Sequence, residues 1–345
     1  MKRRTFTTAM CGTLAQAAFP QARGPVKLGL DVYSVRSQQW TPFQILDFCA
    51  KQKLKVAHFS EPRFLGSLEP GDLEKVRAYA AKLNIDIQVG MMSICPTSGM
   101  FNRAGGAAEQ QIARMVNVAR TVGSPLLRAV LGNEGDRKGP IELHIENAVR
   151  VLRNVRSLVL DNNLKIAIEN HGGDMQAREL KTLIVEAGAD FVGACIDSGN
   201  PLITLEDPHL TLETLAPYVL TSHVRDTAVW RTPEGASVAW VRMGDGNIGI
   251  DDYVRKFVQL CPTAAILLEI IVFTRGRIVN YHDPAFWTRF RNTPAWEFAR
   301  FVTLVDKGTP RPLDPPPGKE EAVKRELEDA EKSFDYTRRL LDTLA

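Results

Sequence analysis

The sequence predicts a (β/α)8 TIM barrel with a C-terminal helical extension. Eight apolar segments have the character of strands, and a helical pattern follows each of them. The segments around 166–168 and 266–268 are apolar on both faces, as in parallel strands that are covered on both sides. The chain of 345 residues is long enough for one such barrel with additions. Strands that alternate with helices are typical of α/β folds.

The first half of the chain contains four strand–helix pairs. Thr41 is a suitable N-cap with Pro42 in the first turn, and Gly123 ends the third helix. The fourth helix has an apolar stripe at helical spacing, formed by Ile145, Val149, Leu152, Val155 and Val159. We expect strands at 26–35, 55–62, 85–94 and 125–132, and helices at 41–52, 71–83, 107–123 and 140–160.

The second half repeats this pattern with one insertion. The expected strands occupy 165–170, 191–197, 220–226 and 264–271, and the expected helices occupy 177–188, 210–217, 250–260 and 285–305. An extra segment, about 230–247, interrupts the seventh pair. We expect it to form a hairpin or a lid beside the end of the seventh strand.

The N-terminus, residues 1–24, has the pattern of a twin-arginine signal peptide. Arg3 and Arg4 precede a mildly apolar, Ala-rich stretch, and the segment contains no acid. The alternative is a disordered basic N-terminus. A signal of this kind predicts a periplasmic or other extracytoplasmic location. The barrel would then span residues 25–307.

Residues 308–345 combine a Pro-rich linker with an amphipathic helix. The helix has an apolar stripe of Val323, Leu327, Ala330, Phe334, Leu341 and Leu344. Three arrangements are open: the stripe packs on its own barrel, it contacts a second subunit to form a homo-oligomer, or the helix is a free tail.

Composition excludes several classes of protein. The chain is 44% apolar and 24% charged, as in globular proteins, and no run of about 18 apolar residues suggests a transmembrane helix. Residues 1–24 hold four basic residues. Taking those four from the 43 Lys and Arg leaves 39 against 40 Asp and Glu, a net charge of −1. No broad surface for nucleic acid is expected. The four Cys beyond residue 24 show no metal-binding or redox spacing.

Four polar residues stand where apolar strands end: Glu169, Asp197, His223 and Glu269. They fall on the fifth to eighth strands, which are neighbours around the barrel. TIM-barrel active sites lie at this end of the strands, so the four side chains should converge. Three carboxylates and an imidazole form a suitable site for one divalent cation. Mn²⁺ is favoured, with Mg²⁺, Co²⁺ or Zn²⁺ as alternatives. For any one of these residues the alternative is an ion pair or a helix cap.

Around these residues the chain resembles the xylose isomerase-like TIM-barrel superfamily of sugar phosphate isomerases and epimerases. The resemblance covers about 26–307 and rests on IAIENHGG, CIDSGNP, SHVRDT, MGDGNIGID and LLEI. It implies that Glu169, Asp197, His223 and Glu269 bind one Mn²⁺-like ion. Ketose epimerases of the family often have His three residues after the metal-binding Asp, where this chain has Asn200.

The resemblance also implies that Glu169 and Glu269 are catalytic. A divalent ion that polarises a sugar carbonyl acidifies the neighbouring C–H group. One Glu would remove that proton, and the other would return it on the opposite face through an enediolate. Candidate substrate-binding residues are His171, Asn200, Arg225, Asp226, Trp230 and Arg242. Tyr33, Glu61 and Arg128 are further candidates for lining the pocket.

We therefore expect a metal-dependent isomerase or epimerase of a small sugar. Because export favours substrates outside the cytoplasm, an unphosphorylated sugar or sugar derivative is preferred to a sugar phosphate. A lyase or hydrolase of keto-glycosides on the same metal site is the first alternative, and an exported sugar-binding protein without turnover is the second. An endonuclease of the endonuclease IV type needs more metal ligands than the six His of this chain suggest.

Overall fold

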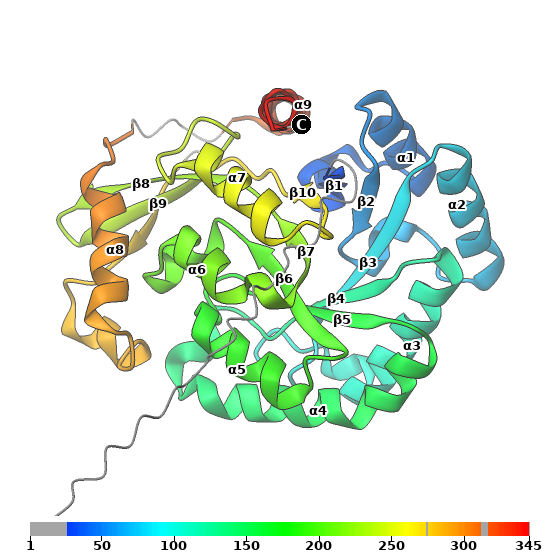
Figure 1. Cartoon of the computed structure of the whole chain (residues 1–345), viewed down its shortest axis with the longest axis horizontal. Helices are drawn as coiled ribbons and strands as arrows, with labels where there is room; N and C mark the ends of the chain where they lie inside the picture. Colours follow the sequence, from blue (N-terminus) through cyan, green and yellow to red (C-terminus); the bar gives the residue numbers. More distant parts are fainter. Residues whose placement is uncertain (1–25, 274, 312–316, 345) are drawn as a thin grey trace, which may run out of the picture.

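The fold is a TIM barrel, as predicted. The computed structural model describes residues 26–273, 275–311 and 317–344. Eight parallel strands run around the barrel in the order β10-β1-β2-β3-β4-β5-β6-β7 (Figure 1). Val224, directly after β7, bridges Leu268 of β10 and closes the ring. The strands are β1 (Leu28–Asp31), β2 (Val56–Phe59), β3 (Asp86–Ser93), β4 (Leu126–Val130), β5 (Lys165–Glu169), β6 (Val192–Asp197), β7 (Val219–His223) and β10 (Ile266–Leu268).

Seven helices follow successive barrel strands and surround them (Figure 1). Thr41 caps the first as expected, since its hydroxyl accepts a hydrogen bond from the Gln44 N–H while the Gln44 side chain accepts one from the Thr41 N–H. Gly123 ends the third helix in the left-handed region, with φ of 79°. The helices are α1 (Pro42–Lys51), α2 (Pro70–Lys82), α3 (Ala108–Val122), α4 (Ile141–Asp161), α5 (Ala177–Ala187), α6 (Pro208–Leu215) and α7 (Ile250–Leu260).

The insertion after β7 builds a second, antiparallel sheet. The expected hairpin is present as β8 (Asp226–Thr232) and β9 (Gly235–Val241), and β11 (Arg277–Val279) pairs with β9. Helix α8 (Ala295–Asp306) contacts β8. The single helix expected at 285–305 is therefore wrong: a 3₁₀ helix spans Pro284–Arg289, and α8 begins only after Pro294. A proline ring has no backbone N–H and disfavours helix in the residue before it.

The C-terminal helix α9 (Lys319–Asp342) packs on its own barrel. The Phe334 ring lies 6.4 Å from the Phe48 ring of α1, and the Tyr336 hydroxyl donates to Asp251 of α7 at 2.6 Å. Helix α9 thus takes the position between α7 and α1 where the eighth barrel helix belongs (Figure 1). Of the three arrangements open from the sequence, the structure shows this one, and it leaves α8 to cover the second sheet.

Phe334→Ala should destabilise the whole barrel, because the Phe334 side chain is fully buried. Removing a buried aromatic side chain costs roughly 3–5 kcal/mol. Urea unfolding of the purified chain measures the change in the free energy of unfolding. Leu143→Ala on the exposed face of α4 is the control and should change it by less than about 0.5 kcal/mol. A loss below about 1 kcal/mol in Phe334→Ala would show that α9 is not part of the core.

Two expectations concern residues that the structure does not describe. The expected signal peptide, 1–24, lies outside the described residues, as does part of the Pro-rich linker, 312–316. Within residues 26–273, 275–311 and 317–344, no helix combines the length and the apolar character needed to cross a membrane.

Candidate metal centre

The structure brings Glu169, Asp197, His223 and Glu269 together at one end of the barrel. Glu169, Asp197 and His223 are the last residues of β5, β6 and β7, and Glu269 directly follows β10. The register pairs Asp197 with His223, so both side chains point to the same side of the sheet. One ligand atom from each of the four residues lies within 4.8 Å of the others. Glu169, Asp197 and His223 are fully buried, and Glu269 is 9% exposed.

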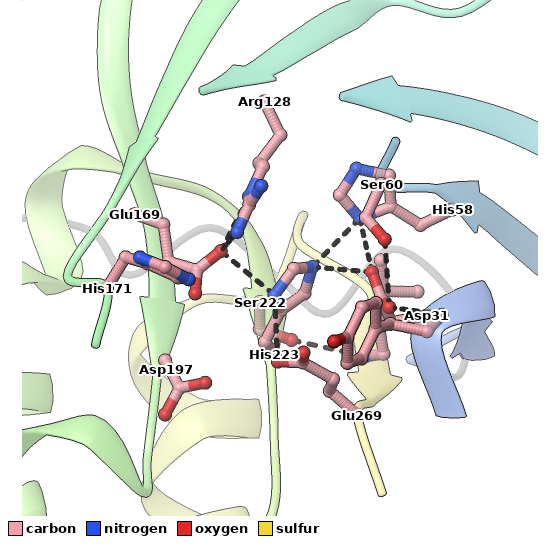
Figure 2. A network of polar contacts seen from close by, with 12 residues as sticks. Asp31, His58, Ser60, Arg128, Glu169, His171, Asp197, Ser222, His223 and Glu269 are labelled. Carbon is pink, nitrogen blue, oxygen red and sulfur yellow. Dashed lines mark hydrogen bonds and ion pairs between the residues drawn. The ribbon is translucent and has the colours of Figure 1, made fainter. Parts of the chain in front are cut away.

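The imidazole of His223 is oriented by Asp31, the last residue of β1 (Figure 2). Its Nε2 lies 3.0 Å from Asp31 Oδ2. Its Nδ1 lies 3.0 Å from Glu169 Oε2 and 3.3 Å from Glu269 Oε2. A ring proton on Nε2, which has a hydrogen-bond partner in His58 Nδ1 and the Asp31 carboxylate close by, leaves Nδ1 to present its lone pair to two carboxylates. Such an arrangement is favourable when a cation lies between them, as in carboxylate–histidine–metal sites.

His58 of β2 lies on the far side of His223. Its Nδ1 is 2.9 Å from His223 Nε2, while its Nε2 is buried without a hydrogen-bond partner. Burial and the neighbouring His223 lower the pKa of His58 to about 3, so this ring is neutral near pH 7. The sequence analysis missed both Asp31 and His58. The same sequence pattern could have found them, because Asp31 and His58 each stand near the end of a buried strand, as the four candidate ligands do.

The carboxylate of Asp197 is held by the turn that follows it. Its Oδ1 accepts hydrogen bonds from the backbone N–H groups of Gly199 and Asn200, both at 2.7 Å. Its Oδ2 contacts the guanidinium of Arg225. Burial raises the pKa of Asp197, although Arg225 opposes that shift. One oxygen is thus committed to the backbone, and the other faces the centre.

Glu169 is paired with Arg128 of β4. The Arg128 Nε donates to Glu169 Oε2 at 2.6 Å, whereas Glu169 Oε1 is buried without a partner. Burial by itself would raise the pKa of Glu169, but Arg128 and His223 hold it well below its usual value. These contacts favour the ionised form of Glu169 and leave one of its oxygens without a hydrogen-bond partner.

These residues fit one divalent cation. Two atoms that bind the same ion at about 2.1 Å and at a right angle lie about 3 Å apart, close to the separations around His223 Nδ1. The four carboxylates of Asp31, Glu169, Asp197 and Glu269 face only two guanidinium groups, from Arg128 and Arg225. One divalent cation would make this group electrically neutral with both imidazoles neutral.

The pKa of His223 responds to the same excess of negative charge. Burial by itself would lower it, but Cys195, Glu169 and Asp31 raise it well above the usual value. A positive charge is thus favoured at this place, whether a proton or a metal ion supplies it.

Arg225 and Trp240 lie over the centre. The Arg225 side chain is buried, and its Nη2 contacts both Asp197 Oδ2 and Glu269 Oε2. Its guanidinium carbon lies 4.1 Å from the Trp240 ring of β9, and that ring stacks on Phe273 at 4.5 Å. The inserted hairpin therefore packs, through Trp240, on the arginine that contacts two of the four candidate metal ligands, Asp197 and Glu269. The sequence analysis named Arg225 but not Trp240.

Two further residues expected to bind substrate, His171 and Asn200, are buried or partly buried and keep a side-chain atom without a hydrogen-bond partner. His171 is partly buried next to β5, and its Nδ1 is 2.8 Å from the Gly132 carbonyl oxygen, which leaves Nε2 available. Burial lowers the pKa of His171. Asn200 is buried, and its Oδ1 has no hydrogen-bond partner.

The structure gives Asp226 contacts within its own loop. Its carboxylate accepts hydrogen bonds from the backbone N–H groups of Thr227, Gly244 and Gly246. This fixes the loop between β9 and α7. Burial outweighs these hydrogen bonds and raises the pKa of Asp226 to about 6.

Trp230 and Arg242 line a cavity of about 780 Å³, whose lining includes none of the four candidate metal ligands. The cavity also includes Ile270 and Ile271, which directly follow Glu269, and one face of α9. Among the other candidates, Tyr33 packs edge-on against Phe64 and Glu61 pairs with Arg63. Much of the wall of this cavity comes from the inserted hairpin and from α9.

Comparison with known proteins agrees with this fold. A family model described as xylose isomerase-like TIM barrel matches residues 50–276. The chain belongs to this family. It is 21% identical over 315 residues to the uncharacterized protein YihM of Escherichia coli K12, covering 90% of this chain and 88% of that protein. It is 25% identical over 189 residues to 3-oxo-isoapionate decarboxylase of Pectobacterium atrosepticum, covering 55% and 57%.

Solved structures of the xylose isomerase-like family share the fold. D-psicose 3-epimerase from Clostridium cellulolyticum H10 with D-tagatose superposes with a TM-score of 0.61 at 12% identity, covering 91% of this chain and 99% of that chain. A family protein from Mycobacterium smegmatis in complex with magnesium has a TM-score of 0.56 at 12% identity, covering 81% and 98%. The IOLI protein with a bound zinc atom has a TM-score of 0.52 at 16% identity, covering 82% and 99%.

Proposed function

We propose that this chain is a divalent-metal-dependent isomerase or epimerase of an unphosphorylated sugar or sugar derivative. Glu169, Asp197, His223 and Glu269 bind the ion, with Mn²⁺ favoured. The observation that carries the proposal is the position of His223 Nδ1, which has no hydrogen-bond partner and faces one oxygen each of Glu169 and Glu269. The ion supplies a Lewis acid that polarises a substrate carbonyl and acidifies the C–H group beside it.

The protein moves the proton with its two glutamates. Glu169 and Glu269 extend from β5 and β10, and each places an oxygen within 3.3 Å of His223 Nδ1. A substrate held against the centre would thus have a carboxylate near each side of the reacting carbon. One glutamate takes the proton to give an enediolate, and the other returns it on the opposite face. Arg128 holds Glu169 in place through its hydrogen bond to Oε2.

The activities named for two similar proteins support this chemistry. One is a 3-epimerase, and one is a decarboxylase of a 3-oxo compound. Inversion beside a ketone and loss of CO₂ from a 3-oxo acid both leave negative charge on a carbon next to a carbonyl. A centre that stabilises an enediolate supports either reaction.

A lyase or hydrolase of keto-glycosides is the second candidate. A cavity of about 780 Å³, whose wall includes Ile270, the residue after Glu269, favours it, because it offers room for a second sugar. The expected twin-arginine signal in residues 1–24 supports an extracytoplasmic substrate. Detection of the processed chain outside the cytoplasm, lost on Arg3→Lys with Arg4→Lys, tests that part.

Proton exchange in D₂O tests the proposed function. The Mn²⁺-loaded protein is incubated with L-sorbose, D-fructose, D-tagatose and a 3-keto-glycoside. The deuterium content of the recovered sugars is then measured by mass spectrometry. An isomerase or epimerase incorporates deuterium into the substrate or its epimer, and a lyase or hydrolase releases the substituent. Protein treated with EDTA is the control. If a sugar binds but no deuterium enters it and nothing is released, the chain is a binding protein.

A further inference from the structure

Two side chains above the metal cluster carry unused hydrogen-bond donors. Arg225 uses its Nη2 on Asp197 and Glu269, but its Nε and Nη1 are buried without a partner. The Trp240 Nε1 is also buried without a partner. Guanidinium and indole N–H groups donate and do not accept. The pair therefore needs a ligand that brings acceptor oxygens.

Arg225 and Trp240 pack closely against Gly199, where any larger residue would clash. A Cβ added at Gly199 would stand 2.6 Å from Arg225 Cδ and 2.9 Å from Trp240 Nε1. The Trp240 ring also supports the guanidinium face from 4.1 Å. Gly199, Arg225 and Trp240 thus form one compact group, here called the arginine–tryptophan subsite. It contacts the four proposed metal ligands through Arg225 Nη2, and through the Gly199 N–H, which donates to Asp197 Oδ1.

Metal binding would weaken the ion pairs that Arg225 makes with Asp197 and Glu269. Arg225 Nη2 contacts Asp197 Oδ2 and Glu269 Oε2, and the proposed function gives the same two carboxylates to the ion. A cation that shares these oxygens weakens their attraction for the guanidinium. A buried guanidinium without an acidic partner is unfavourable. The planar fork of an arginine matches the two oxygens of a carboxylate.

We propose that Arg225 and Trp240 bind a carboxylate of the substrate, which makes the substrate a sugar acid that also carries a hydroxy-ketone. The inference rests on the proposed function and narrows it. The hydroxy-ketone occupies the metal cluster and the carboxylate occupies the arginine–tryptophan subsite. Neutral sugars that lack the carboxylate leave the three donors unpaired.

Calorimetric titration of the Mn²⁺-loaded protein with a matched pair of ligands tests this. The pair is 5-keto-D-gluconate and L-sorbose, which differ by a carboxylate in place of a hydroxymethyl group. We expect the acid to bind at least about 10-fold more tightly. Arg225→Gln should remove that preference, so the ratio of the two affinities is the readout. Arg156→Gln, on the exposed surface of α4, is the control and should keep the preference.

Two outcomes would overturn the inference. Equal affinity for the two ligands in the wild-type protein is one. A preference for the acid that survives in Arg225→Gln is the other, since the ion would then bind the carboxylate. Should Arg225→Gln fail to fold, Trp240→Phe keeps the aromatic ring but removes its donor, and it should lower the preference several-fold. An unchanged preference in Trp240→Phe would count against the subsite.

The same ligands separate this inference from the proposed function. Equal binding with metal-dependent deuterium exchange in both ligands refutes the carboxylate subsite and leaves the enediolate chemistry intact. Tight, Arg225-dependent binding of the acid supports the subsite even when no deuterium is exchanged, and the failure then lies with the proposed reaction. Manganese content is measured in each variant so that loss of the ion is not mistaken for loss of the subsite.

Discussion

Asp197→Asn is expected to weaken Mn²⁺ binding by roughly 100-fold or more. The substitution removes one negative charge from a cluster whose excess charge is what a divalent cation would neutralise. The new amide can still accept the Gly199 and Asn200 N–H bonds through its oxygen, so the turn after β6 should be kept. Its NH₂ group would then replace Oδ2 and face the ion. Calorimetric titration of the metal-free protein with Mn²⁺ measures the affinity.

Asp86→Asn is the matched control for this experiment. Asp86 lies at the start of β3, at the opposite end of the barrel, and its exposed side chain pairs with Lys27. Its Mn²⁺ affinity should equal that of the wild-type protein, with one ion per chain. If Asp197→Asn binds Mn²⁺ as tightly as Asp86→Asn, the assignment of this metal centre is wrong.

Glu269→Gln is expected to lower deuterium exchange into a responsive substrate by about 10²–10⁴-fold. A carboxylate that moves a proton in the transition state contributes a factor of this size, and an amide cannot accept the proton. Glu269 is the most accessible of the four cluster residues, at 9% exposure, and its neighbours Ile270 and Ile271 line the adjoining cavity. Exchange rates are measured at saturating Mn²⁺ and normalised to the manganese content.

Two comparisons make the result specific. Glu297→Gln changes a buried glutamate that pairs with Arg178. Because Glu297 lies on α8, which packs on the second sheet, the exchange rate of this variant should stay near that of the wild type. Glu169→Gln should also lower exchange, because the proposed chemistry needs a carboxylate near each face of the reacting carbon. A Glu269→Gln protein that holds Mn²⁺ and exchanges within tenfold of the wild-type rate would remove Glu269 from the reaction.

Much of the fold and part of the site can be predicted from local pattern. Alternating apolar strands and amphipathic helices follow from periodicity, because each element must bury one face or both. The convergence of Glu169, Asp197, His223 and Glu269 follows from chain topology, since the ends of neighbouring parallel strands meet at one end of a barrel. Asp31 and His58 satisfy the same rule on β1 and β2, and a uniform search of all eight strand ends would have found them.

The exchange of roles between the last two helices could not be predicted in this way. The segments that form α8 and α9 both have apolar stripes, and periodicity says that each must pack without saying on what. Pro294 shortens α8, and the antiparallel sheet offers it a surface at β8. The vacant position between α7 and α1 then accepts α9, whose Phe334 fills it. Such choices depend on contacts between segments far apart in the chain.

The sequence by itself determined the barrel, its strand order and the four residues that gather at the strand ends, because these depend on short-range pattern and one topological rule. Tertiary structure alone decided the role of each polar group. It directs Asp226 to the amides of its own loop, sets Asp31 behind His223, and brings Trp240 from the hairpin onto Arg225. The physical reason is that hydrogen-bond partners and desolvation depend on three-dimensional neighbours, which spacing along a chain does not encode.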